Sequence, residues 1–280
     1  MALSASDPRK WPVGASTCTF PYPEFTDNLQ ACKEAGVSHI ELIINGAWLE
    51  DEAGSAELHK RAEAIKHAGL TLWSAHLPFG RDWNIASSDA ERRQYVLQVF
   101  TTLMQKLGDL GVTVAVIHPG AEPIADADRE DTFKRSKDGL SYLAAVAKAS
   151  GVVLAAENLP RTCIPNVSDE MLRLLDGSAD LRVCLDANHS LKESTEAFVG
   201  KVGGKIVTVH MSDYDNVDER HWMPGQGVNN WTAIIRELSN CGYTGPFLYE
   251  VSQKKAGPFT PHDLVTCRQR LLDDYMVSHP

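Results

Sequence analysis

The sequence predicts an α/β protein with a single domain, folded as a (β/α)₈ TIM barrel. Short apolar runs rich in β-branched residues alternate with longer stretches of helical periodicity down the whole chain. The runs start roughly 25 to 40 residues apart, which is the length of a strand, a crossover helix and two loops. Eight such units fit into the 280 residues and place the barrel core at about 13–275.

Each predicted strand is a short apolar segment. The eight segments lie at 13–20, 39–45, 70–78, 112–120, 152–160, 181–189, 205–213 and 247–252. An open doubly wound sheet would more often carry a Gly-rich phosphate-binding loop after its first strand. No such loop follows the first run, VGASTCTF, so the pattern favours the closed barrel.

The segments of helical periodicity lie between these strands and after the last one. They include 26–36, 55–69, 88–111, 129–151, 230–242 and 260–276. Several begin with Ser, Thr or Asp and several end with Gly, which are the residues preferred at helix N-termini and C-termini. No linker or change of composition divides the chain, so we expect one domain over 1–280.

The composition bears on partners and location. A formal net charge of −10 disfavours nucleic acid as a partner, because proteins that neutralise phosphates carry clustered basic surfaces. The N-terminal segment has no apolar core of a signal peptide, and no apolar run approaches the ~18 residues of a membrane span. The six cysteines lack metal-binding spacings and are expected to be reduced thiols. We therefore expect a cytoplasmic protein without a membrane partner; a homo-oligomer is compatible with this fold, although no segment predicts an interface.

Polar residues occur late in six of the eight predicted strands or directly after them. In a barrel of this type the carboxyl ends of the strands build the active site. Carboxylates and imidazoles that converge there would repel or remain unpaired unless a cation or a hydrogen-bond network held them. These residues are His76, His118, Glu157, Asp186, His189, His210, Asp213 and Glu250.

A divalent metal is the simplest explanation for this convergence. We expect Glu157, Asp186, His210 and Glu250 to be its ligands. Two Glu, one Asp and one His form a mostly oxygen donor set, which favours Mn²⁺ and also suits Mg²⁺ or Co²⁺. The additional histidines leave Zn²⁺ open.

Five motifs in this order carry a resemblance: AAENLPR, CLDANH, VHMSD, RHWMPGQG and LYEV. They resemble the sugar phosphate isomerase/epimerase family of xylose-isomerase-like TIM barrels, which includes ketose 3-epimerases. The resemblance implies a sugar isomerase or epimerase that abstracts a proton next to a carbonyl through a metal-stabilised enediolate. It also implies that Glu157 and Glu250 are the catalytic acid/base pair and that His189 contacts the substrate, a small-molecule sugar or keto-sugar.

Further residues near the predicted strand ends are candidates for substrate binding. Arg161 and Arg220 could orient a substrate or pair with nearby acids, and Trp222 and Trp83 could stack on a sugar ring. For Glu41, in the second strand, we expect a structural hydrogen bond. The complete set of substrate-binding candidates is His76, His118, Arg161, His189, Asp213, Arg220, His221 and Trp222.

Three other functions share parts of this pattern. A lyase or hydratase acting on 3-keto-glycosides, or a C-glycoside deglycosidase, would begin with the same proton abstraction. The chain also resembles endonuclease IV, a three-zinc nuclease, at His76, His118, Glu157, Asp186, His189, His210, His221 and Glu250, with Glu219 where that family has Asp. The third alternative is a catalytically inactive metal-binding barrel.

Overall fold

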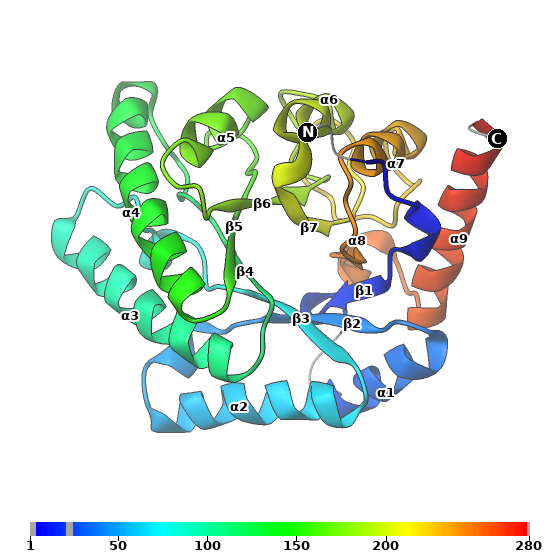
Figure 1. Cartoon of the computed structure of the whole chain (residues 1–280), viewed down its shortest axis with the longest axis horizontal. Coiled ribbons are helices and arrows are strands. Elements are labelled where there is room, and N and C mark those ends of the chain that lie inside the picture. The colour runs from blue at the N-terminus through cyan, green and yellow to red at the C-terminus, as the bar shows by residue number, and fades with distance from the viewer. Residues whose placement is uncertain (1–3, 21–24, 279–280) are drawn as a thin grey trace.

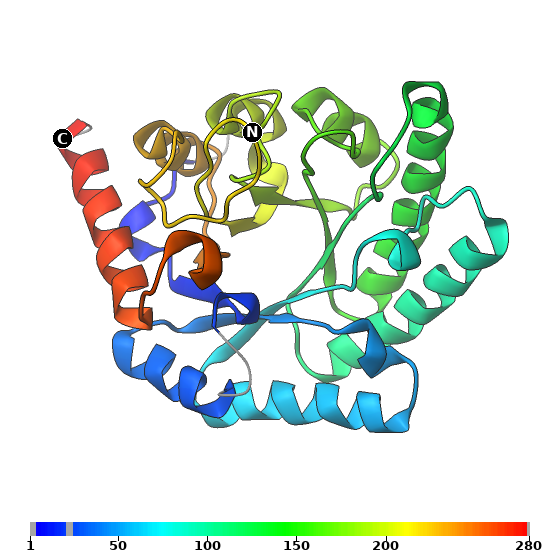
Figure 2. The ribbon, with the colours of Figure 1, turned by 180° about the vertical axis from the view of Figure 1, so that it is seen from behind.

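Eight parallel strands surround the centre of the molecule, and helices form a ring outside them (Figures 1 and 2). The computed structural model describes residues 4–20 and 25–278. Neighbouring strands follow the order β7-β6-β5-β4-β3-β2-β1-β8. Just beyond β7, the Met211 amide donates to the Leu248 carbonyl at 2.8 Å, and Met211 bridges Tyr249. These contacts bring the two ends of the sheet together, and the predicted (β/α)₈ barrel is confirmed.

All eight predicted strands form, and each is shorter than predicted because the apolar runs continue into the loops. The strands are β1 Val13–Ser16, β2 His39–Ile43, β3 Thr71–His76, β4 Val114–Ile117, β5 Val153–Glu157, β6 Arg182–Asp186, β7 Ile206–His210 and β8 Phe247–Tyr249. The helices are α1 Phe25–Ala35, α2 Glu52–His67, α3 Ala90–Asp109, α4 Arg129–Ala149, α5 Ser168–Leu175, α6 Thr195–Val202, α7 Trp231–Asn240, α8 Gln253–Ala256 and α9 Pro261–Ser278. The short helices α5, α6 and α8 were not among the helices predicted from the sequence.

The ends of the long helices carry the capping residues that the sequence predicted. The Asp89 carboxylate accepts hydrogen bonds from the amides of Glu91 and Arg92 at 3.0 and 3.1 Å and so caps α3. Gly69 follows α2 with φ 71°, a left-handed conformation that favours glycine. Within the described part of the chain, no helix has the length and apolar character needed to cross a membrane.

Alternation along the strands points the site residues into the barrel. Ala155, Cys184 and Val116 belong to a small apolar cluster separate from the main core, and each lies two residues before Glu157, Asp186 or His118. Because successive side chains of a strand point to opposite faces, these pairs share the interior face. The intervening residues Ala156, Leu185 and Ile117 pack in the main core toward the helices.

Two register shifts adjust this alternation at the histidine-bearing strands. Between β2 and β3 the pairing skips Trp73, and between β6 and β7 it skips Val207. Both skipped residues pack against the inner apolar cluster. An extra residue of this kind re-aims the side chains that follow it. The shifts thereby bring His76 and His210 to the interior at the ends of their strands.

The loop after β7 is organised by one buried carboxylate. Asp213 accepts hydrogen bonds from the amides of Tyr214 and Asn229 at 3.0 and 3.1 Å, and from the Gly225 amide and the Trp231 indole at 2.8 and 2.9 Å. Gly227 lies so close that an added Cβ would be 2.5 Å from an Asp213 oxygen. Asp213, proposed from the sequence as a substrate contact, thus has both oxygens engaged by its own loop.

We expect Asp213→Asn to destabilise this loop, because an amide cannot accept all four hydrogen bonds and its NH₂ group would face donors. Leaving a buried donor without an acceptor costs about 1–3 kcal/mol. The free energy of unfolding, measured by urea denaturation, should therefore fall by about that amount. The control is Asp109→Asn, which removes the same charge from an exposed helix end and should change stability by less than about 0.5 kcal/mol. Equal effects of the two substitutions would contradict this role of Asp213.

Candidate metal centre

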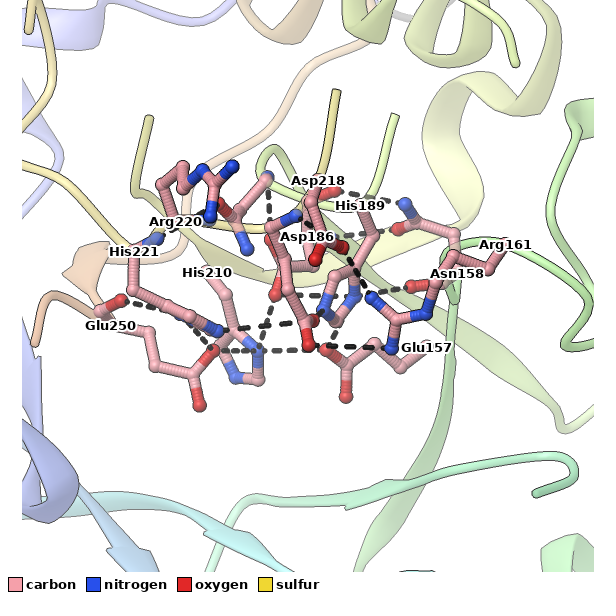
Figure 3. A network of polar contacts seen from close by, with 12 residues as sticks. Glu157, Asn158, Arg161, Asp186, His189, His210, Asp218, Arg220, His221 and Glu250 are labelled. Atoms are coloured by element: carbon pink, nitrogen blue, oxygen red, sulfur yellow. Dashed lines mark hydrogen bonds and ion pairs between the residues drawn. The ribbon is translucent and has the colours of Figure 1, made fainter. Parts of the chain in front are cut away.

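Four of the predicted residues converge at the carboxyl ends of their strands. Glu157, Asp186 and His210 are the last residues of β5, β6 and β7, and Glu250 directly follows β8. One potential ligand atom from each lies within 4.8 Å of the others. The His210 Nδ1 atom is 3.2 Å from Glu157 and 3.4 Å from Glu250. Figure 3 shows the two glutamates on either side of His210.

Burial makes this arrangement costly without a cation. The Asp186 Oδ2 atom is buried and accepts no hydrogen bond, although His189 Nδ1 is 3.3 Å away. Burial raises the pKa of Asp186 well above its usual range. Burial alone would also raise the pKa of Glu157, but His210 and His118 reverse the effect and hold it well below its usual range. An unpartnered carboxylate oxygen aimed at three other donors fits a bound divalent ion.

Glu41 fixes the orientation of the His210 ring. Its Oε2 atom lies 3.1 Å from His210 Nε2 and accepts from the Ser74 hydroxyl at 2.9 Å. The structural hydrogen bond predicted for Glu41 is therefore confirmed. A carboxylate behind a histidine holds the ring so that the other nitrogen faces the ligand group. Here that nitrogen is Nδ1, which faces Glu157, Asp186 and Glu250.

A second donor group shares Glu157 with the first. His76 and His118 place their Nε2 atoms 3.1 and 3.2 Å from Glu157 Oε2. Because the carbonyl of Leu77 can only accept, His76 donates to it from Nδ1 at 2.8 Å and its Nε2 faces the group. These three residues form a compact cluster of possible ligands.

A third donor group consists of His189, Glu219 and His221. His189 donates from Nδ1 to the Asn158 carbonyl at 2.9 Å and contacts Glu219 through Nε2 at 3.0 Å. The hydrogen bond from His189 lowers the pKa of Glu219 to about 2. Burial works against a charged His189, but Asp186 and Glu219 outweigh it and raise the pKa of His189 to about 10. His189 and Glu219 therefore form an ion pair, and an ion bound here would have to displace a proton.

The two predicted arginines are held by acids. Arg161 pairs with Glu122, with Asp218 at 2.7 Å and with Glu219 at 3.3 Å, and Arg220 pairs with Asp215 at 2.7 Å. These contacts follow the second of the two expectations from the sequence. Arg161 and His221 adopt left-handed backbone conformations, with φ 52° and 49°. Residues other than glycine rarely adopt this conformation, and those that do are often found at functional sites.

The aromatic residue most open to a ligand was not among the candidates from the sequence. Trp83 stacks on Phe100 at 5.9 Å and so belongs to the packing of the core. Trp222 is half-buried, and its backbone pairs with Asp213. Phe79, in contrast, is 53% exposed and stacks on His118 at 4.5 Å. Its position in HLPFG, three residues after the end of β3, is the signal that could have identified it.

The fold and these donor groups define a TIM barrel with a metal-capable centre at the carboxyl ends of its strands. The chain belongs to the xylose isomerase-like TIM barrel family, which matches residues 29–268.

Individual relatives within this family have different names. L-ribulose-5-phosphate 3-epimerase UlaE of Escherichia coli is 22% identical over 261 residues, which cover 88% of each chain. Probable endonuclease 4 of Acholeplasma laidlawii is 25% identical over 175 residues, so that the match spans 55% of this chain and only 59% of that protein. The structure of D-psicose 3-epimerase from Clostridium cellulolyticum H10 superimposes with a TM-score of 0.76 at 18% identity, covering 95% of this chain and 98% of that one. The family likeness is thus to sugar epimerases and isomerases, with the nuclease as a more partial match.

We expect Glu41→Gln to weaken metal binding, because the amide holds the His210 ring less firmly and makes Nδ1 a poorer ligand. Loss of such a supporting carboxylate typically lowers metal affinity about 10–100-fold. Competition with a chelator in the purified protein measures the affinity. The matched control is Glu193→Gln, which removes a carboxylate held by Ser168 and Lys201 away from the centre and should leave the affinity unchanged. An unchanged affinity in Glu41→Gln would rule out this role.

Proposed function

We propose that this chain is a metal-dependent sugar isomerase or epimerase that moves a proton on a carbon next to a carbonyl. The observation that carries the proposal is the pair of carboxylates, Glu157 and Glu250, on two sides of one donor group. One carboxylate can take a proton from a bound sugar while the other returns it. The names of several relatives support the same chemistry.

The ligands of the ion would be Glu157, Asp186, His210 and Glu250, since among the donor groups of the described residues this one contains a buried carboxylate oxygen, Oδ2 of Asp186, that accepts no hydrogen bond. The oxygen-rich set favours Mn²⁺, with Mg²⁺, Co²⁺ and Zn²⁺ as alternatives. When bound, a divalent ion polarises the carbonyl and stabilises the negative charge that develops on its oxygen. We infer a small-molecule sugar or keto-sugar as the substrate and the cytoplasm as the location.

The surroundings of the two glutamates differ, which suits different roles in proton transfer. Glu157 is 1% exposed and touches His76, His118 and His210. The side chain of Glu250 is 13% exposed and lies 3.8 Å from the Cys18 sulfur. A carboxylate surrounded by imidazoles can pass a proton to them, whereas the more open one can reach the substrate from the other side. We expect His221 to contact hydroxyls of the sugar at the mouth of the barrel, and His189 to do so if it exchanges its contact with Glu219 for one with the sugar.

In D₂O, a sugar that is isomerised or epimerised should gain one deuterium on an otherwise unchanged carbon skeleton, detected by NMR. Glu157→Gln and Glu250→Gln should each slow this exchange by roughly 10²–10⁴-fold, the usual contribution of general acid/base catalysis. Metal content, measured for each variant, separates loss of the ion from loss of the base. Glu193→Gln should exchange at the wild-type rate. Full exchange in both site variants would refute the catalytic roles of the two glutamates, and no exchange by the wild type on any keto-sugar would favour an inactive metal-binding barrel. Release of an aglycone would identify a lyase, hydratase or deglycosidase.

Abasic-site nuclease activity is a second candidate, because the three donor groups together offer ligands for more than one ion. The relative named probable endonuclease 4 points the same way. Against it stand the net charge of −10 and the pairing of Arg161 and Arg220 with acids. Incubation of the zinc-loaded protein with a duplex containing an abasic site decides the matter: cleavage would establish the nuclease, and an intact duplex would leave the sugar enzyme.

A further inference from the structure

A cavity of about 220 Å³ opens beside the donor groups. Its walls include His118, His189 and Glu219, which belong to the donor groups, together with Phe79 and Arg161. Because His118 contacts Glu157 at 3.2 Å, a molecule in this cavity that touches His118 is one side chain away from the carboxylate that we propose as a catalytic group. This inner cavity is therefore a natural place for the reacting sugar.

Phe79 gives the inner cavity an aromatic wall. The ring is 53% exposed, yet its orientation is fixed by stacking on His118 at 4.5 Å with 27° between the planes, and it also meets His76 edge-on. A large apolar side chain that stays exposed beside a polar site commonly marks a contact surface for a ligand. The apolar face of a pyranose ring, which carries C–H bonds, matches such a surface.

The charges around the inner cavity do not favour a phosphate group. Two arginines line the inner cavity: Arg161, which Glu122, Asp218 and Glu219 already neutralise, and Arg81, which also lines the outer cavity and donates to the Glu122 carbonyl at 3.5 Å. The carboxylates of these residues and of the metal centre make this wall acidic. A phosphate beside Arg161 and the metal centre would face mainly carboxylates and would be repelled there.

A second, outer cavity of about 580 Å³ shares Arg81, Ala121 and Glu122 with the inner one. Its remaining walls are mostly polar, with Asn84, Ser87, Ser88 and Thr132 beside charged groups of both signs. Asp128, Asp131 and Glu122 outnumber Arg81 and Arg135, and Arg135 donates to the Ala86 carbonyl and the Thr132 hydroxyl. Such walls suit a neutral molecule with many hydroxyl groups.

We propose that the substrate is an unphosphorylated glycoside. Its reacting sugar ring lies in the inner cavity against Phe79, and the neutral group attached to that ring extends past Arg81 and Ala121 into the outer cavity. This inference rests on the proposed function, and it adds the substrate class and two subsites. The inner cavity alone is smaller than the roughly 300–1,000 Å³ of most small-molecule sites, and the outer cavity supplies the remaining space.

Binding to the metal-loaded protein can be measured without turnover by using sugars that lack a keto group. The probes are methyl glycosides of glucose, galactose and mannose, the disaccharides cellobiose, lactose and mannobiose, glucose 6-phosphate and inorganic phosphate, followed by saturation-transfer NMR and calorimetry. We expect at least one disaccharide to bind more tightly than its methyl glycoside and more tightly than either phosphate. Tighter binding of glucose 6-phosphate or inorganic phosphate would overturn the proposal.

Three substitutions test the two subsites. Phe79→Ala should weaken binding of the disaccharide roughly 3- to 10-fold, as expected for loss of an aromatic contact, and Phe79→Tyr should restore it. Ser88→Trp, in the outer cavity alone, should weaken the disaccharide and leave the methyl glycoside unaffected. Tyr142→Ala is the control, because this tyrosine is 51% exposed on α4 and lines neither cavity. Equal binding by Phe79→Ala and the wild type, or an unchanged disaccharide affinity in Ser88→Trp, would contradict the assigned subsites.

The binding and exchange experiments together distinguish failure of the glycoside proposal from failure of the proposed function. Deuterium exchange on free ketoses without any binding of glycosides would leave the isomerase or epimerase standing and refute the glycoside. Binding of disaccharides without exchange on any keto-sugar would refute the proposed reaction while retaining the two subsites.

Discussion

The buried carboxylate of Glu157 is the group on which the arrangement of the site depends. Four imidazoles surround it: His210 at 3.2 Å, His76 at 3.1 Å, His118 at 3.2 Å and His189 at 3.5 Å. They come from four different strand ends, so each strand must have the register that turns its last residues inward. A slip by one residue would turn a side chain into the apolar layer under the helices and leave Glu157 a buried charge with fewer partners, which is costly.

The side chains around Glu157 are oriented before any ligand arrives. His76 and His189 each donate one ring nitrogen to a backbone carbonyl, and His210 is held by Glu41. In each case the second nitrogen faces a carboxylate. Fixing the ring in this way lowers the reorganisation that binding of an ion would require. Among the four proposed ligands, Asp186 carries a buried oxygen without a hydrogen bond, and this distinguishes their donor group from the ion pair of His189 with Glu219.

The sequence predicted the parts of the site that follow from strand periodicity and missed those that depend on loops. Glu157, Asp186 and His210 end apolar runs, so the barrel topology alone brings them together. The partners of Arg161 were open, because Glu122 and Asp218 lie 39 and 57 residues away in loops whose conformation no periodicity describes. Phe79 was missed for a related reason: its orientation depends on stacking against His118, which follows the next strand. The short helices α5 and α6 span eight residues each, too few for a clear helical pattern.

The ion pairs of Arg161 connect the architecture of the mouth with its choice of ligand. This one guanidinium joins the loops after β4, β5 and β7 through Glu122, Asp218 and Glu219, and Glu219 in turn reaches His189. Because the positive charge is neutralised within the protein, it is withdrawn from any anionic ligand. The guanidinium of Arg161, a group that could otherwise bind a phosphate, is thus used to hold these loops in place. The proposed preference for hydroxyl groups and apolar ring faces over phosphate therefore has the same physical origin as the order of the mouth, namely the ion pairs of Arg161.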